Sequence, residues 1–251
     1  MSWADRVMFV VWILLGLVIL AELLQTARGA SLEVQIAPRF GNASGQFDRA
    51  AFTNAAGETL SVTRADLLVS DFALRRADGA WLGKSNEVAF LHLAAEHTSF
   101  RVAGIPAGHY DQLRFRVGVP TELNHSDAAK YPADHPLNPN FNGLHWSWQG
   151  GYIFMALEGR WSAPGTESPS GYSLHLANDW NLTTVTLPVA LELFRDVWLQ
   201  LDFDLAGLLH SMSFAKDGTS THSREGDPLA GTLAANLPKA FRVSRDGAGV
   251  P

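Results

Sequence analysis

The segment Trp198–Leu205, with the sequence WLQLDFDL, indicates most clearly what kind of fold this chain adopts. Apolar residues alternate along it with three polar ones, which are Gln200, Asp202 and Asp204. Because successive side chains of a strand point to opposite faces, a period of two is typical of a half-buried β-strand. The segment therefore predicts a strand whose acidic side chains lie on a solvated face.

Further segments earlier in the chain resemble this strand in length and composition. They are short, rich in Val, Leu and Phe, and bounded by Gly, Pro, Asn or Asp, which commonly end strands. We predict strands at Leu32–Ile36, Leu67–Leu74, Val88–Leu93, Gln112–Val119, Tyr152–Leu157, Tyr172–Leu176, Thr183–Leu191 and Val197–Leu205. Repeated short strands predict a sandwich or a barrel, and we expect an all-β chain with a single β-sandwich-like domain over residues 31–251.

One helical pattern follows the last of these strands. In Asp227–Phe241 (DPLAGTLAANLPKAF), apolar residues recur every four positions, at Leu229, Leu233, Leu237 and Phe241. Proline is tolerated in the first turn of a helix, where Pro228 stands, and we expect Pro238 to break its end. The pattern predicts one short amphipathic C-terminal helix.

Two long stretches lack any strand or helix period, namely 120–151 and 210–226. Loops of this length in a compact domain are usually functional or disordered. The first contains the aromatic residues Tyr131, Phe141, Trp146 and Trp148, so we expect it to be ordered and packed. The shorter stretch Ala163–Gly171 is interpreted as a hairpin tip.

Composition excludes several classes of function. The chain has 251 residues, 47% of them hydrophobic, and 19 Lys and Arg against 25 Asp and Glu, which gives a net charge of −6. An acidic chain without basic runs does not neutralise phosphates, so we expect no nucleic-acid partner. The absence of cysteine excludes disulfides, Cys-ligated zinc or iron–sulfur sites and thiol catalysis.

The N-terminus contains an apolar run from Val7 to Ala21. It is shorter than the roughly 20 residues that cross a bilayer and close to the upper length of a signal-peptide core. Ala27 and Gly29 provide the small residues of a cleavage site. We expect residues 1–30 to be a signal peptide or membrane anchor, with a buried core helix as the alternative. Either form of export segment contacts the membrane and makes the protein periplasmic, extracellular or anchored to the inner membrane.

Motifs for catalysis are absent from the sequence. There is no nucleophile elbow, metalloprotease helix, P-loop or dinucleotide fingerprint in the chain. For the acidic pair Asp202 and Asp204 a glycosidase-type pair or a calcium site are alternatives to the solvated face. We expect a protein that is not an enzyme, with a hydrolase of unknown type as the least favoured hypothesis.

The histidines are stronger candidates for a functional site than these acidic residues. All nine lie beyond residue 90, and those in or beside the long loops are His125, His135, His145, His210 and His222, while His175 lies in a predicted strand. In an exported chain without cysteine, imidazole is the main remaining ligand for copper or zinc, although a single histidine is more often hydrogen-bonded structure. Met155 and Met212 are possible thioether ligands, but packing is favoured for Met155.

Trp146 and Trp148 are two positions apart and project from one face of an extended chain. Three interpretations remain open. The pair is an aromatic wedge over an open sandwich edge, a stacking platform for sugar rings, or a redox-modified site near a metal.

Several longer motifs together resemble a known family. They are VTRADLLVSDFALRRADG, GHYDQLRFRVGVP, GVPTELNHSD, PLNPNFNGLHWSWQGGYIFMALEG, SLHLAND, STHSREGDPLA and NLPKAF. Over roughly residues 31–243 the chain resembles the MbnP family of exported, copper-associated bacterial proteins. The resemblance implies a β-rich protein with a diheme cytochrome c peroxidase-like partner. That partner oxidises a tryptophan to a kynurenine-type product, which helps histidines bind copper.

The resemblance also implies the site residues. Trp148 and Trp146, in the WSWQ motif, are the candidates for oxidation. The candidate copper ligands are His125, His175 and His222, with His145 in reserve. The chain departs from relatives that have four cysteines or a W-x-H arrangement. We expect an exported copper-binding or copper-handling protein; the alternative is an extracytoplasmic carbohydrate- or ligand-binding module that uses the Trp146/Trp148 loop.

Overall fold

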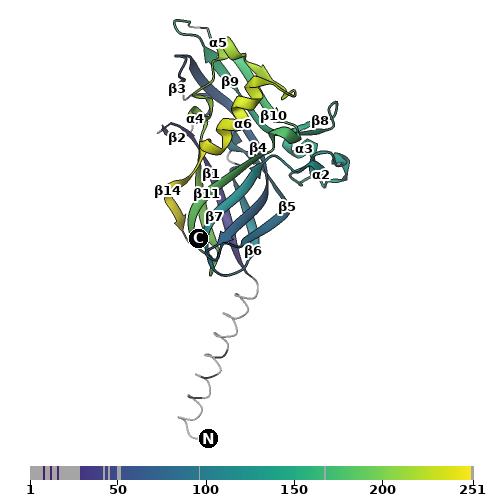
Figure 1. Cartoon of the computed structure of the whole chain (residues 1–251), viewed down its shortest axis with the longest axis vertical. Helices are drawn as coiled ribbons and strands as arrows, with labels where there is room; N and C mark the ends of the chain where they lie inside the picture. Colours follow the sequence, from purple (N-terminus) through teal and green to yellow (C-terminus); the bar gives the residue numbers. More distant parts are fainter. Residues whose placement is uncertain are drawn as a thin grey trace.

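Two β-sheets form the frame of the molecule in the computed structural model (Figure 1). The structure describes residues 8, 12, 16, 29–41, 43–44, 46–49, 52–95, 97–166 and 168–249. The predicted signal peptide or anchor lies outside the described residues, except for the few positions just given. In this described part of the chain, no helix combines the length and the apolar character needed to cross a bilayer.

The smaller sheet has five strands in the order β14-β12-β1-β2, with β6 paired to β1. β1 and β12 run parallel, and the other pairings are antiparallel. The five strands are β1 (Ala30–Phe40), β2 (Ala43–Ser44), β6 (Ser99–Ile105), β12 (Val197–Asp204) and β14 (Phe241–Gly249).

The larger sheet has nine strands in the order β11-β7-β4-β9-β10-β13, with β3 and β5 paired to β4 and β8 paired to β9. Its strands are β3 (Phe52–Thr53), β4 (Thr59–Arg76), β5 (Trp81–His92), β7 (His109–Val117), β8 (His145–Trp146), β9 (Gly151–Ser162), β10 (Ser170–Ala177), β11 (Thr183–Glu192) and β13 (Ser220–Thr221). Neither sheet closes into a barrel. The prediction of an all-β, sandwich-like fold is confirmed, and each predicted strand overlaps an observed one.

Aromatic contacts join the two sheets across the main core. Phe72 of β4 lies 4.4 Å from Phe100 of β6, measured between ring centroids, and Phe115 of β7 lies 5.3 Å from Phe241 of β14. Tilted and edge-on pairs at such separations contribute beyond the area they bury. β6 and β14, which the sequence analysis did not predict, therefore complete the core from the small-sheet side.

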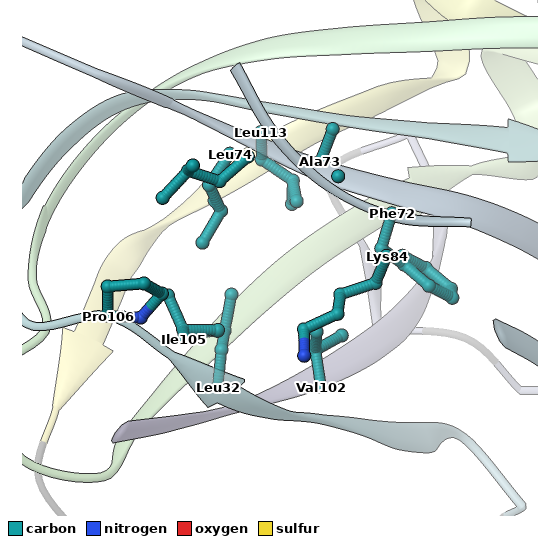
Figure 2. A pocket seen from close by; sticks show the side chains of 11 residues that line it. Leu32, Phe72, Ala73, Leu74, Lys84, Val102, Ile105, Pro106 and Leu113 are labelled. Atoms are coloured by element: carbon teal, nitrogen blue, oxygen red, sulfur yellow. The ribbon is translucent and has the colours of Figure 1, made fainter. Parts of the chain in front are cut away.

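A small apolar cavity remains between the sheets at the end near β6. Leu74 and Leu113 face Leu32, Val102 and Ile105 across it (Figure 2). Its volume is about 30 Å³, which is room for one or two waters at most. An organic ligand does not fit in this cavity.

Along one of its edges, the long strand β4 pairs with two different strands in succession. Up to Leu67 it pairs with β9, and from Val69 it pairs with β7. Gly118 follows β7 at this divergence, and its N–H donates to Leu68 O at 2.7 Å. It has φ +110°, and a Cβ there would lie 2.5 Å from Phe154 Cδ2. Only glycine fits this close approach.

The stretch that leaves the sheet at Gly118 folds back over its outer face. It contains α2 (Thr121–Asn124), η2 (Ala128–Lys130), α3 (Pro139–Asn142) and β8. Leu137 and Leu144 are fully buried there and join a second apolar cluster with Tyr152 and Phe154 of β9. The prediction of an ordered, packed loop is confirmed, and β9 is buried on both faces because of it.

The second long stretch also contains short elements. β12 runs into α4 (Leu205–Leu209), which is followed by α5 (Phe214–Asp217), β13 and the C-terminal helix α6 (Pro228–Ala240). Two short turns, η1 (Leu93–Ala95) and η3 (Asp179–Asn181), follow β5 and β10, respectively. Residues 163–169 join the antiparallel strands β9 and β10, which confirms the hairpin tip.

The predicted C-terminal helix is confirmed with one correction. Asp227 caps α6 by accepting from the N–H groups of Leu229 and Ala230, and Pro228 stands in the first turn. Pro238 does not end the helix, which continues to Ala240. A proline this near the C-terminus removes one hydrogen bond only, and the buried side chains of the last turn hold the helix in place.

Asp202 of β12 does not lie on a solvated face. Asp202 is buried and paired with Arg39 at 2.8 Å and Arg242 at 3.2 Å. Asp204 caps α4 by accepting from Gly207 N. The solvated-face prediction is therefore wrong for Asp202: its neighbours on β1 and β14 supply the cations that a buried carboxylate requires.

Candidate functional site

Four of the residues singled out in the sequence meet at one place on the large sheet. Trp146 is the central one, since its ring centroid lies 5.6 Å from that of His222, 5.9 Å from that of His175 and 5.3 Å from that of Trp148. The ring centroids of His175 and His222 lie 6.1 Å apart, and the two ring planes are nearly perpendicular, at 85°. We call these four residues the Trp–His cluster.

Strand pairing positions the cluster. β8 pairs with β9 through Trp146 and Gly151, and β10 pairs with β9 on the same sheet. β13 runs parallel to β10, with Thr221 opposite Leu174. His222 follows β13 directly, and it therefore arrives beside His175 although 46 residues separate the two in the sequence.

Ser223 fixes His222 against β10. Its hydroxyl donates to His175 O at 2.7 Å and accepts from Ala177 N at 2.9 Å. Its own carbonyl accepts from the side chain of Asn178 at 2.8 Å. Ser223 is fully buried and has φ +56°, an unusual backbone conformation outside glycine, which these bonds hold in place.

His175 has one engaged and one unengaged ring nitrogen. Nε2 lies 3.0 Å from Glu158 Oε1 and 3.2 Å from Ser173 Oγ. A carboxylate only accepts, so the proton is on Nε2. Nδ1 is buried and has no hydrogen-bond partner among the described residues. It therefore presents an unshared lone pair in an enclosed position, beside Trp146 and His222.

Glu158 is itself held by a cation. Arg64 of β4 lies opposite Glu158 of β9, and its Nη1 donates to Glu158 Oε1 at 2.9 Å. Burial of Glu158 opposes its charge, but the hydrogen bond from His175 and the charge of Arg64 outweigh it and lower the carboxyl pKa. Glu158 thus stays ionised and keeps the His175 ring in one tautomer.

The cluster opens to solvent on the side of His222. His222 lines an open hollow together with Trp148, Gln149 and Arg224. Trp148 is 70% exposed, whereas Trp146 is half-buried. Trp146 and His175 are therefore the less exposed members of the cluster.

His125 lies in a different environment. Its Nδ1 is 3.1 Å from Gly150 O and its Nε2 is 3.1 Å from Asp179 Oδ2, so both ring nitrogens face acceptors. Asn124 donates to the other oxygen of Asp179. Burial opposes the charge of Asp179, but the bonds from Asn124, His125 and Thr121 lower its pKa. His125 ties the turn after Trp148 to η3, and as a copper ligand it stays a prediction.

His145 precedes Trp146 in β8, but its ring and the two methionine side chains make other contacts. The ring of His145 packs edge-on against Tyr152 at 4.8 Å, and burial lowers its pKa. Met155 and Met212 are both buried in the main core, which confirms packing for Met155. In the described ranges no group of three or more His, Asp or Glu side chains is spaced to hold a metal ion.

Glu158, Arg64 and Ser223 were not singled out in the sequence. The charged pair lies on neighbouring strands 94 positions apart, and nothing local to either residue indicates the pairing. For Ser223 the only available signal was its place next to His222 in STHSR.

Comparisons with known proteins cover most of the chain. The MbnP family model matches residues 29–223, which include every member of the Trp–His cluster. The fold is similar to that of MbnP from Methylosinus trichosporium, with a TM-score of 0.57 and 19% sequence identity, over 89% of this chain and 100% of that one. At this identity the likeness concerns the fold alone. No curated protein is significantly similar to the chain.

Proposed function

Because the chain belongs to the MbnP family, we propose that it is an exported copper-binding or copper-handling protein whose binding site is the Trp–His cluster. The observation that supports this most is the buried, unpartnered Nδ1 of His175. A buried imidazole lone pair without a hydrogen bond is unfavourable unless another group binds it. A metal ion would do so, since copper binds imidazole nitrogen readily.

The surroundings of His175 resemble those of metal-binding histidines in general. Such a histidine usually donates a hydrogen bond from the N–H of its second ring nitrogen to a carboxylate, which fixes its orientation and raises its basicity. Glu158 accepts from His175 in this way, and Arg64 keeps Glu158 charged. His222 would supply the second imidazole from the solvent side. The residues present therefore fit a copper ion, which would supply a Lewis-acidic centre that takes further nitrogen or oxygen donors.

Trp146 is the tryptophan that we propose is oxidised to a kynurenine-type product. It contacts both imidazoles, whereas Trp148 is largely exposed. Two equivalents of peroxide would cleave the C2–C3 bond of the Trp146 indole to N-formylkynurenine and release two waters. Hydrolysis of the formyl group, which leaves as formate, would then place an aryl amine and a carbonyl beside the two histidines. The proposed oxidant is peroxide, used by a diheme cytochrome c peroxidase-like partner that would approach from the side of Trp148.

We also propose that the protein is exported. The N-terminal segment would serve as a signal peptide or an anchor, and the domain would act in the periplasm, outside the cell or on the inner membrane. The chain would bind copper and be modified by its partner without being an enzyme itself.

A carbohydrate- or ligand-binding module is the second candidate function. The exposed indole of Trp148 beside the open hollow with Gln149 and Arg224 favours it. An exposed aromatic face next to polar side chains is suited to stacking on a sugar ring.

Copper titration of the full-length chain tests the proposal. We expect His175→Ala and His222→Ala each to weaken Cu²⁺ binding strongly, while His109→Ala does not, because His109 is an exposed histidine on β7 far from the cluster in sequence. Copper binding that survives both substitutions, in chains with unchanged circular dichroism, would reject the site. Sugar binding that is lost in Trp148→Ala, without any effect on copper, would favour the second candidate.

A further inference from the structure

A second pair of histidines lies on the large sheet outside the Trp–His cluster. His92 ends β5, and His97 follows the short turn η1. His92 N donates to His97 O at 2.8 Å, and His97 N donates to His92 O at 3.2 Å, so the two form an antiparallel bridge. Residues that exchange both bonds lie directly opposite, with Cα atoms about 5.5 Å apart and side chains on the same face.

The two rings share one aromatic neighbour. The His92 ring is stacked on Phe90, with centroids 6.3 Å apart and planes at 11°, and the His97 ring lies 6.0 Å from the same Phe90 ring. Phe141, from the loop over the sheet, contacts both Phe90 and His97 edge-on. These contacts limit the positions that the two imidazoles can take.

Asp66 determines which nitrogen of His92 is available. The buried carboxylate of Asp66 bonds to His92 Nδ1 through Oδ1, and its Oδ2 accepts from Arg64 Nε at 2.6 Å. A carboxylate only accepts hydrogen bonds, so the proton of this contact is on His92 Nδ1, and the lone pair of His92 is left on Nε2. The His92 side chain is 38% exposed, so this lone pair is within reach of solvent.

Arg64 therefore contacts the carboxylates of two carboxylate–histidine couples. Glu158 with His175 is the first, and Asp66 with His92 is the second. His97 is exposed, and its ring makes aromatic contacts without a hydrogen bond to any described residue. The second couple thus has a free imidazole directly opposite it, just as His175 has His222 beside it.

We propose that His92 and His97 form a second transition-metal site, which takes a divalent ion of the Cu²⁺, Ni²⁺ or Zn²⁺ class through two imidazoles, with water completing the coordination. Imidazole nitrogen suits these ions. The bridging hydrogen bonds fix the spacing of the two residues, and Asp66 acts as the outer carboxylate that orients His92. This site stands on contacts of its own and does not depend on the proposed function of the Trp–His cluster.

Zinc titration of the full-length chain tests the second site, with Zn²⁺ alone as the probe and calorimetry as the readout. The test is made in the His175→Ala/His222→Ala double variant, so that the first cluster contributes nothing. We expect one ion per chain. His92→Ala or His97→Ala should each weaken it by about 100-fold, because two linked ligands bind far more tightly than one.

Two controls make the outcome decisive. His109→Ala removes an exposed histidine that also lies near a carboxylate, Glu192, and should leave zinc affinity unchanged. Asp66→Asn retains both imidazoles and should weaken binding by about 10–100-fold. It should also move the proton of His92 between its ring nitrogens in ¹⁵N NMR spectra.

Equal zinc affinity in His97→Ala, His109→Ala and the parent would overturn the site, since binding would then be that of single surface histidines. A His175→Ala/His222→Ala variant that binds no zinc would also overturn the site, because zinc binding would then belong to the Trp–His cluster.

Discussion

The ring of His175 and the carboxylate of Glu158 are joined by a hydrogen bond from Nε2 to Oε1, 3.0 Å long, and the same oxygen accepts from Arg64. One charged triplet on three adjacent strands therefore sets the tautomer of a histidine whose other nitrogen is buried without a partner among the described residues. That histidine contacts Trp146. The arrangement leads to predictions about binding, modification and stability.

Glu158→Gln should weaken copper binding by about 10–100-fold, the usual effect of removing a carboxylate behind a metal-binding histidine. The glutamine retains the shape of the side chain but not its charge, so His175 is less basic and its tautomer less fixed. Copper titration gives the affinity, and ¹⁵N NMR reports which nitrogen of His175 is protonated. Glu192→Gln, which removes an exposed carboxylate near His109, is the matched control. An unchanged affinity in Glu158→Gln would contradict the positioning role.

Trp146→Phe should abolish the kynurenine-type modification, whereas Trp148→Phe should leave it detectable. Trp146 is half-buried and contacts both imidazoles, and Trp148 is largely exposed. The check is peptide mass spectrometry on protein produced together with a diheme peroxidase-like partner and peroxide. Modification confined to Trp148 would assign the reaction to the exposed ring and remove our reason for choosing Trp146.

Gly118→Ala should lower the free energy of unfolding by about 2–4 kcal/mol, through backbone strain and a collision with a packed ring. A Cβ there would lie 2.5 Å from Phe154 Cδ2, at φ +110°. Gly79→Ala provides the control, since Gly79 has φ +88° with nothing near its absent Cβ, and should cost about 1–2 kcal/mol. Urea unfolding measures both, and equal losses would show that Phe154 yields without cost.

Asp179→Asn should reduce the dependence of stability on acid pH. Burial opposes the charge of Asp179, but hydrogen bonds from Asn124, His125 and Thr121 hold its pKa below the ordinary value in the folded state. The stabilisation is complete above the unfolded pKa of about 3.9 and is lost as pH falls through the lowered folded value. Unfolding free energies at neutral and strongly acid pH should therefore differ less in the variant than in the parent. Glu225→Gln, at an exposed position, should leave that difference as it is.

Asp227→Ala should destabilise the chain by about 0.5–2 kcal/mol, because the N–H groups of Leu229 and Ala230 lose their acceptor. Asp227 also accepts from Thr221, the residue before His222. The variant should therefore bind copper more weakly as well, whereas Asp227→Asn should retain the cap and most of the affinity. Thermal unfolding and copper titration of both variants measure the two effects, and a loss of stability without any change in copper affinity would contradict the link to His222.

Alternating and four-residue patterns were enough to predict eight of the strands and the C-terminal helix, because burial on one face leaves a local period in the sequence. Where burial has another cause, the prediction was wrong. Asp202 occupies a polar position of its strand, but Arg39 and Arg242 on the neighbouring strands enclose it. The strand β6 was missed because it is short and its period is interrupted at Gly104.

The sequence by itself determined the fold class and the residue types that could bind copper, since both depend on local composition and on motifs. Only the tertiary structure decided that His175 and His222 meet at Trp146, while His125 is tied to Asp179. The pairing of β10 with β13 and the bonds of Ser223 bring the first two histidines together. The role of Glu158 also became apparent only from the tertiary structure. A charged residue within a strand looks like any solvated side chain until the neighbouring strands show which cation and which imidazole lie within hydrogen-bonding distance.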